Sequence, residues 1–147
     1  MAKLHLIKLS VGSESIEALT SWQQGRSAER RRLGLDPRPR HITRMWPRRE
    51  AELLEGGSIY WVVSGVLLVR QRIEALDEVI GDDGIRRCAI VLNPELIRVE
   101  PRPRGPFQGW RYLKPEDAPP DMTVRGFEEA QLPFELREEL TKFGIIR

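Results

Sequence analysis

Residues 41–73, HITRMWPRREAELLEGGSIYWVVSGVLLVRQRI, decide the fold that the sequence predicts. They read as a strand, a short helix, a glycine turn and two strands with almost no polar residue between them. Residues 58–63 and 66–69 are mostly β-branched, aromatic or aliphatic, and Ser64-Gly65 between them suits the tip of a hairpin. Because both faces of this hairpin are apolar, we expect it at the centre of a sheet or small barrel.

Basic and aromatic side chains stand at the two ends of the same segment. Arg70 and Arg72 end the hairpin, and strand alternation places both on one face. The strand and loop before the hairpin add four more candidates, which are His41, Thr43, Arg44 and Trp46. The segment therefore predicts a ligand-facing surface beside the central hairpin.

The composition is that of a soluble globular protein with one domain, spanning residues 1–147. The chain is 40% hydrophobic and 31% charged, and its net charge of +2 does not by itself indicate a polyanion partner. Four of its 24 basic residues are lysines and the other 20 are arginines. Arginine suits bidentate recognition of phosphate and stacking on bases, but a codon bias of the genome would give the same excess.

The sequence also predicts several absences. A single cysteine, Cys88, excludes an internal disulfide and a cysteine-based zinc site, and its apolar surroundings indicate a buried, inert thiol. No leader pattern is present, and no apolar run approaches the ~20 residues that span a bilayer. We expect a cytoplasmic protein with no membrane association and no cofactor.

The remaining elements are predicted outward from the central segment. Residues 3–11 alternate as an opening strand, and Ser13 or Ser15 caps a helix over residues 15–33. Residues 74–80 fit either a continued strand or a helical turn. The apolar side of the first helix is expected to carry Ile16, Leu19, Trp22 and Gln23. We expect a short helix over 48–54, strands over 85–92, 96–99 and 107–113, and a closing helix over 133–143.

Each of two charged clusters could be either a functional site or an ordinary solvent-exposed feature. Arg30-Arg31-Arg32 near the end of the first helix is either a solvated helix face or a phosphate-binding patch. Asp82-Asp83 lies in a Gly-Asp-Asp-Gly turn, where solvent-facing turn chemistry is more common than a metal or acid/base site.

No motif of a known enzyme class is present in the sequence. There is no phosphate-binding glycine loop, no dinucleotide fingerprint and no nucleophile elbow. His41 beside Thr43 and Arg44 is the best candidate for acid/base chemistry, and a structural histidine at a strand start is the alternative. Two histidines without supporting carboxylates do not predict a metal site.

The positive signal is a set of aromatic residues interleaved with arginines. Trp46 lies among three arginines, and Trp110 and Tyr112 flank Arg111. Base stacking and phosphate contacts of this kind are used to bind unpaired nucleotides on sheets and barrels. Trp110 and Tyr112 share a strand face beside Gly109, so they form either an open stacking surface or part of the core.

Five stretches of the sequence resemble a known bacterial family. They are LHLIKL at 4–9, HITRMWPRR at 41–49, ELLEGGSIYWVVSG at 52–65, RQRI at 70–73 and PFQGWRYLKPEDAP at 106–119. On these stretches, nearly the whole chain resembles the family called domain of unknown function 1489. This resemblance implies membership but no particular activity.

Residues 52–73 are also similar in layout to part of the PUA-like superfamily, which includes ASCH and EVE domains. In those domains a basic strand, a short helix with a glycine turn and a strand pair form part of a small β-barrel. Many of them bind RNA or modified bases, and some ASCH proteins are small hydrolases. The chain lacks an unmistakable ASCH signature, so no ligand contact is carried over.

Together these features predict an α+β fold with a small mixed, mainly antiparallel β-barrel or curled sheet, PUA-like and covered by N- and C-terminal helices. The predicted function is binding of single-stranded RNA or a nucleotide-like anion near the central hairpin. The candidate ligand-binding residues are His41, Thr43, Arg44, Trp46, Arg70, Arg72, Trp110 and Arg111. The alternatives are a small hydrolase acting on a nucleoside-like amide and a protein-interaction module.

Overall fold

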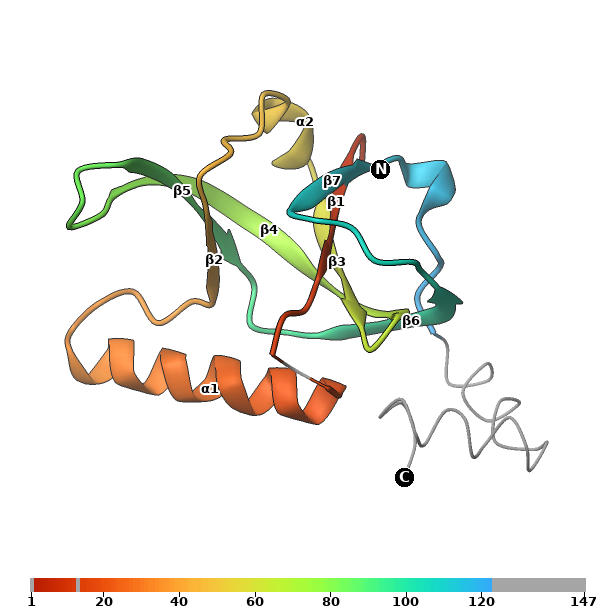
Figure 1. Cartoon of the computed structure of the whole chain (residues 1–147), viewed down its shortest axis with the longest axis horizontal. Helices are drawn as coiled ribbons and strands as arrows, with labels where there is room; N and C mark the ends of the chain where they lie inside the picture. The colour runs from red at the N-terminus through yellow and green to blue at the C-terminus, as the bar shows by residue number, and fades with distance from the viewer. Residues whose placement is uncertain (1, 13, 123–147) are drawn as a thin grey trace.

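The computed structural model describes residues 2–12 and 14–122, which form an α+β fold with a seven-stranded sheet (Figure 1). The elements are β1 (His5–Leu9), α1 (Ile16–Arg32), β2 (Arg40–Thr43), α2 (Glu50–Leu53), β3 (Ser58–Val63), β4 (Val66–Ile80), β5 (Arg86–Leu92), β6 (Ile97–Pro103) and β7 (Trp110–Leu113), followed by the short 3-10 helix η1 (Pro115–Asp117). Among the described residues, neither α-helix has the length and apolar character that crossing a membrane requires.

The hairpin of β3 and β4 is the centre of the sheet, as predicted. Its two turn residues, Ser64 and Gly65, have φ angles of 50° and 82°, which is the pattern of a type I′ turn. Every residue of β3 is buried. β4 continues to Ile80 as one long strand, which settles the open question of residues 74–80 in favour of a strand.

The sheet is mainly antiparallel and open. Its strand order is β2-β5-β4-β3-β1-β7, with β6 paired to the first half of β4, and β1 with β3 is the one parallel pair among the described strands. No ladder joins β2 to β7 within the part of the chain that the structure describes, so the closed barrel form is not adopted. The predicted mixed, mainly antiparallel sheet is confirmed.

Side chains join the two ends of this open sheet. The Trp110 indole on β7 donates a hydrogen bond of 3.2 Å to the carbonyl oxygen of Met45, just after β2. The Tyr112 hydroxyl accepts one of 3.2 Å from the backbone N–H of Arg49. Two aromatic residues predicted as a stacking surface therefore fasten β7 to the β2–α2 connection.

Apolar side chains pack on both faces of the central hairpin. Ile59, Trp61 and Val63 belong to one cluster, and Tyr60 and Val62 belong to a second. This arrangement confirms the prediction that the hairpin is buried on both sides. The Cys88 thiol is fully buried, and burial raises its pKa to about 11, as expected of an inert thiol.

Helix α1 lies across one end of the sheet, near the end of β1 and the start of β2 (Figure 1). Its N-cap is Ser15, whose hydroxyl accepts a 3.0 Å hydrogen bond from the N–H of Ala18. Ile16, Leu19 and Gln23 are buried against the sheet, but Trp22 is 55% exposed. The prediction that Trp22 lies on the buried side is wrong, because that side is narrow and includes the polar Gln23.

Several predicted boundaries need correction. The last strand begins at Trp110 rather than at residue 107, because residues 104–109 form an irregular connection. The first strand covers His5–Leu9 rather than residues 3–11. The closing helix predicted over 133–143 lies outside the described residues, so cover by a second terminal helix stays a prediction.

Candidate functional site

The main candidate site is a pocket of about 200 Å³ between α1, the end of β1 and the start of β2. We call it the α1 pocket. The residues that line it include Lys8, Trp22, Gln23, Arg40, His41 and Trp61. None of the residues that line it is acidic. A cationic pocket with two indole rings is a setting for an anion that carries an aromatic group.

Lys8 reaches the pocket because of the alternation of β1. Leu4 and Leu6 face the core, and Lys8 continues the same face at the end of the strand. Its ammonium group donates a 3.2 Å hydrogen bond to the carbonyl oxygen of Leu9. Lys8 is half-buried, and this burial lowers its pKa.

Arg40 is the most unusual side chain of the pocket. Its Nε and Nη2 atoms are buried and have no hydrogen-bond partner among the described residues. Nη2 lies 3.6 Å from a carboxylate oxygen of Asp36, which is longer than a hydrogen bond, and Asp36 is held by Arg38 at 2.7 Å. Burial, then the charge of Arg30, lowers the pKa of Arg40. A buried guanidinium without acceptors costs free energy, and a bound anion would supply them.

His41 adds a neutral imidazole beside these two cations. Its ring meets Trp61 edge-on with the centroids 6.0 Å apart. Burial and the nearby Lys8 lower the pKa of His41 to about 4, so the ring is uncharged at neutral pH. In that state His41 offers one hydrogen-bond donor and one acceptor to a ligand.

A buried amide network fixes the floor of the pocket. Gln23 and Gln71 exchange two hydrogen bonds of 2.8 Å, and the Trp61 indole donates to the Gln71 carbonyl oxygen at 2.9 Å. The Gln71 amide also donates to the carbonyl oxygen of Asn93 at 3.0 Å. Sequence reasoning did not single out Gln71, although alternation between Arg70 and Arg72 places it on the opposite, inward face.

The mouth of the pocket exposes apolar surface. Val11 is 84% exposed and Trp22 is 55% exposed, and both line the pocket. The guanidinium of Arg26 lies 5.4 Å from the centroid of the Trp22 ring. An exposed indole beside an arginine is suited to stacking with a planar ligand.

Arg70 and Arg72 line a different, wider hollow, of about 680 Å³, together with Glu55 and Glu95. Arg70 is already satisfied, because it donates to both carboxylate oxygens of Asp121, at 2.7 and 2.8 Å, and to the Ser58 hydroxyl at 2.9 Å. Arg72 is exposed. The structure thus brings the two arginines together, as alternation predicted, but Arg70 has an internal carboxylate.

Thr43, Arg44 and Trp46 do not gather around His41. The Thr43 hydroxyl accepts a 3.3 Å hydrogen bond from the N–H of Met45, and Arg44 is exposed. Trp46 is half-buried, donates to Glu50 at 3.3 Å, and has the Arg86 guanidinium 4.4 Å from its ring centroid. This leaves no acid/base constellation of His41, Thr43 and Arg44.

Trp110 and Arg111 do not form an open stacking surface. Trp110 is 6% exposed and contacts the Tyr112 ring edge-on, with the centroids 5.0 Å apart. The Arg111 guanidinium donates to the carbonyl oxygens of Gln108 and Trp110. Of the two alternatives that the sequence left open for Trp110, the structure favours the core, because the connection after β2 covers its ring.

The acidic turn after β4 is structural. Asp83 accepts hydrogen bonds from Arg87 at 3.0 and 2.7 Å and from the N–H of Ile85 at 3.0 Å. These donors lower the pKa of Asp83. In the described part of the chain, no group of three or more histidine, cysteine or acidic side chains could hold a metal ion.

Comparison with known proteins identifies the chain at the level of its family. No curated protein and no solved structure matches it. A family model described as "Protein of unknown function (DUF1489)" matches residues 6–146, which is nearly the whole sequence and agrees with the resemblance seen in the sequence. The chain therefore belongs to the DUF1489 family.

Proposed function

We propose that the protein binds a nucleotide-like anion, free or as a unit of single-stranded RNA, in the α1 pocket. Lys8 and Arg40 would hold the phosphate, His41 would add an uncharged hydrogen bond, and Trp22 would stack on the base. The observation that supports this proposal is the Arg40 guanidinium: two of its buried nitrogens have no hydrogen-bond acceptor among the described residues, and its contact with the Asp36 carboxylate is 3.6 Å long.

This proposal moves the site from the residues that the sequence favoured. Of those residues, His41 lines the α1 pocket. Arg70 already donates hydrogen bonds to Asp121, so it is not free to bind a phosphate. Trp110 is buried, so it is not free to stack on a base. Arg44 and Arg72 are exposed, and the Arg44→Gln/Arg48→Gln variant described below tests whether Arg44 contributes to a competing site.

We also propose that the fold is related to PUA-like domains. What supports this is the order of α2, the glycine turn and the β3–β4 strand pair within a mainly antiparallel sheet. A side chain at Gly57 would collide with the carbonyl oxygens of Leu53 and Leu4, so the turn after α2 requires glycine. An experimental structure that superposes on a PUA-like domain across this unit would support the relation.

The test of ligand binding uses uridine 5′-monophosphate and its two parts, uridine and inorganic phosphate. A ligand at about 100 times its Kd stabilises the native state by about 2.7 kcal/mol. We expect the thermal midpoint to rise most with uridine 5′-monophosphate, less with phosphate and least with uridine, because the pocket contains both cations and indoles.

The matched variants are Lys8→Gln and Lys3→Gln. Lys3 precedes the same strand but is exposed and paired with Glu55 at 2.9 Å. Lys8→Gln should remove most of the midpoint shift, and Lys3→Gln should keep it. No shift with the nucleotide or with phosphate, or the same shift in both variants, would refute the α1 pocket as the site.

A further inference from the structure

Three neighbouring hollows lie beside α1 and share lining residues, and the α1 pocket is one of them. A small one of about 20 Å³ shares Trp22, Gln23 and Arg40 with the α1 pocket. The next, of about 310 Å³, shares Gln23, Ser27, Arg38 and Pro39 with the small one. We call this row of hollows the α1 groove. It runs between α1 and the proline-rich connection that leads into β2.

Basic residues, and no acidic ones, line the α1 groove, although the chain as a whole is nearly neutral. No acidic residue lines any of the three hollows. Its basic residues are Lys8, Arg26, Arg30, Arg31, Arg38 and Arg40. With 24 basic and 22 acidic residues in the sequence, a groove lined by six basic and no acidic side chains is a marked segregation. Such a groove attracts a polyanion along its length.

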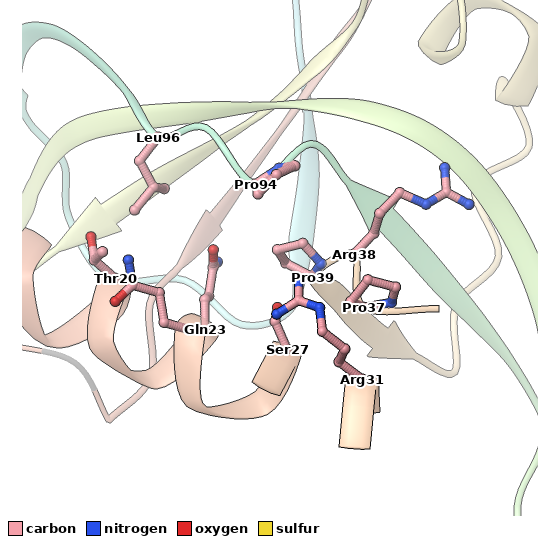
Figure 2. Close-up of a pocket in the computed structure, with 10 residues that line it drawn as sticks. Thr20, Gln23, Ser27, Arg31, Pro37, Arg38, Pro39, Pro94 and Leu96 are labelled. Atoms are coloured by element: carbon pink, nitrogen blue, oxygen red, sulfur yellow. The ribbon is translucent and has the colours of Figure 1, made fainter. Parts of the chain in front are cut away.

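The far end of the groove combines apolar proline rings with polar groups. Figure 2 shows Pro37 and Pro39 opposite the polar side chains of α1, with Pro94 above them. It also shows Arg31 reaching from α1 toward Pro39, whereas Arg38 points away from the helix. Arg38 is paired with Asp36 and Glu74, but Arg31 has no such partner among the described residues.

The size of the α1 pocket limits what it alone can hold. At about 200 Å³ it is smaller than the ~300–1,000 Å³ of pockets that enclose a drug-sized ligand. The part of α1 from Leu19 to Arg31 extends the lining by about 18 Å, at about 1.5 Å per residue. A ligand with several phosphates therefore fits the groove better than a single nucleotide fits the pocket.

We propose that the protein binds single-stranded nucleic acid, with one nucleotide in the α1 pocket and the following ones along the α1 groove. Arg26 and Arg31 contact the following phosphates, and the exposed Trp22 stacks on a base at the mouth of the pocket. This inference rests on the proposed function, since it extends a strand from the same pocket. An alternative role for the basic last turn of α1 is to stabilise the negative end of the helix dipole.

The experiment compares uridine 5′-monophosphate with oligouridylates of two, four and eight nucleotides by competition against a labelled octamer. We expect affinity to rise at least tenfold from the mononucleotide to a length of roughly four nucleotides, the lower end of site sizes for single-strand binders. The double variant Arg26→Gln/Arg31→Gln should lose this gain and reduce the salt slope by about 1.4, at about 0.7 per phosphate. Because Arg26 also lies beside Trp22 at the mouth of the α1 pocket, the mononucleotide control is Arg31→Gln alone, whose affinity for the mononucleotide should not change.

The matched control is Arg44→Gln/Arg48→Gln, which removes the same charge at two exposed positions outside the groove. It should bind the octamer as the wild type does, and all variants should melt at the wild-type temperature because the altered side chains are exposed. A duplex of the same length should bind at least tenfold more weakly, since its bases cannot stack on Trp22.

Each contrary result has a definite meaning. If the mononucleotide binds but length adds nothing, the strand path is wrong and the proposed function stands. If neither the mononucleotide nor any oligomer binds, the proposed function itself fails. A loss in the Arg44/Arg48 variant alone, or equal binding of duplex and single strand, would also overturn the groove as the path.

Discussion

Two half-buried arginines of this sheet differ in how their guanidinium groups are satisfied. Arg70 donates three hydrogen bonds of 2.7 to 2.9 Å, to the carboxylate of Asp121 and the hydroxyl of Ser58. Arg40 has two buried nitrogens without a hydrogen-bond partner among the described residues, and its contact with the Asp36 carboxylate is 3.6 Å long. Proteins keep unsatisfied buried cations rarely, because the lost hydration is not recovered. This contrast agrees with a structural role for Arg70 and supports the proposed ligand-binding role of Arg40.

Truncating Trp110 should cost far more unfolding free energy than truncating Trp22. Trp110→Ala should reduce the free energy of unfolding by about 3–5 kcal/mol, because the ring is buried and its N–H bonds to Met45. Trp22→Ala should change it by no more than about 0.5 kcal/mol, because the ring is largely exposed. Urea unfolding of both variants measures this difference, and equal costs would contradict the assignment of Trp110 to the core.

His41 should make stability depend on pH in the mildly acidic range. Its pKa in the folded protein is about 4, below the ordinary value of 6.5, so protonation favours the unfolded chain. The contribution is fully present above pH 6.5 and is lost as the pH falls to about 4, with a total on the order of 3 kcal/mol. Urea unfolding between pH 7.5 and 4 should show a steeper loss in the wild type than in His41→Gln. Parallel profiles would show that burial does not perturb His41.

At the scale of elements, the β3–β4 hairpin should be the last part of the chain to open. Ile59→Ala should cost about 2–5 kcal/mol of unfolding free energy, since Ile59 is fully buried on the central strand. Ile42→Ala on the edge strand β2, where the side chain is 42% exposed, is the matched control and should cost much less. Amides of residues 58–69 should exchange with solvent only through global unfolding. Fast exchange there would exclude the hairpin as the core.

The elements show what local sequence can and cannot determine. The hairpin was predictable because its apolar run, its turn residues Ser64-Gly65 and its length all indicate the same structure. The placement of Trp110 was not, because alternation gives the face of a strand but not what covers that face. Met45 and Arg49 cover it, and they lie more than 60 positions away in the sequence.

At the scale of the whole molecule, the candidate site lies at a place where the sheet is open. Side-chain hydrogen bonds join β7 to the connection after β2 at one place, while α1 lies across the end of the sheet where Lys8 and Arg40 meet (Figure 1). The pocket forms there because the end of β1 and the start of β2 are separated rather than paired. An open end in a curled sheet thus leaves room for a ligand.

The site was only partly predictable for the same reason. His41 was selected from its neighbours in the sequence, and it does line the pocket. Lys8, Arg40 and Trp22 come from segments that look ordinary alone: an opening strand, a connector and a helix face. Their juxtaposition depends on tertiary packing, and the unsatisfied nitrogens of Arg40 have no signature in the sequence.

The most direct test of the proposed role of Arg40 is the joint effect of Arg40→Met on stability and on nucleotide binding. Methionine keeps the length and apolar stem of the side chain but removes the unpartnered buried guanidinium. The proposed role predicts that the free energy of unfolding rises by about 1–3 kcal/mol while affinity for uridine 5′-monophosphate falls at least tenfold. A less stable variant that binds the nucleotide as tightly as the wild type would contradict it, because Arg40 would then be a structural residue.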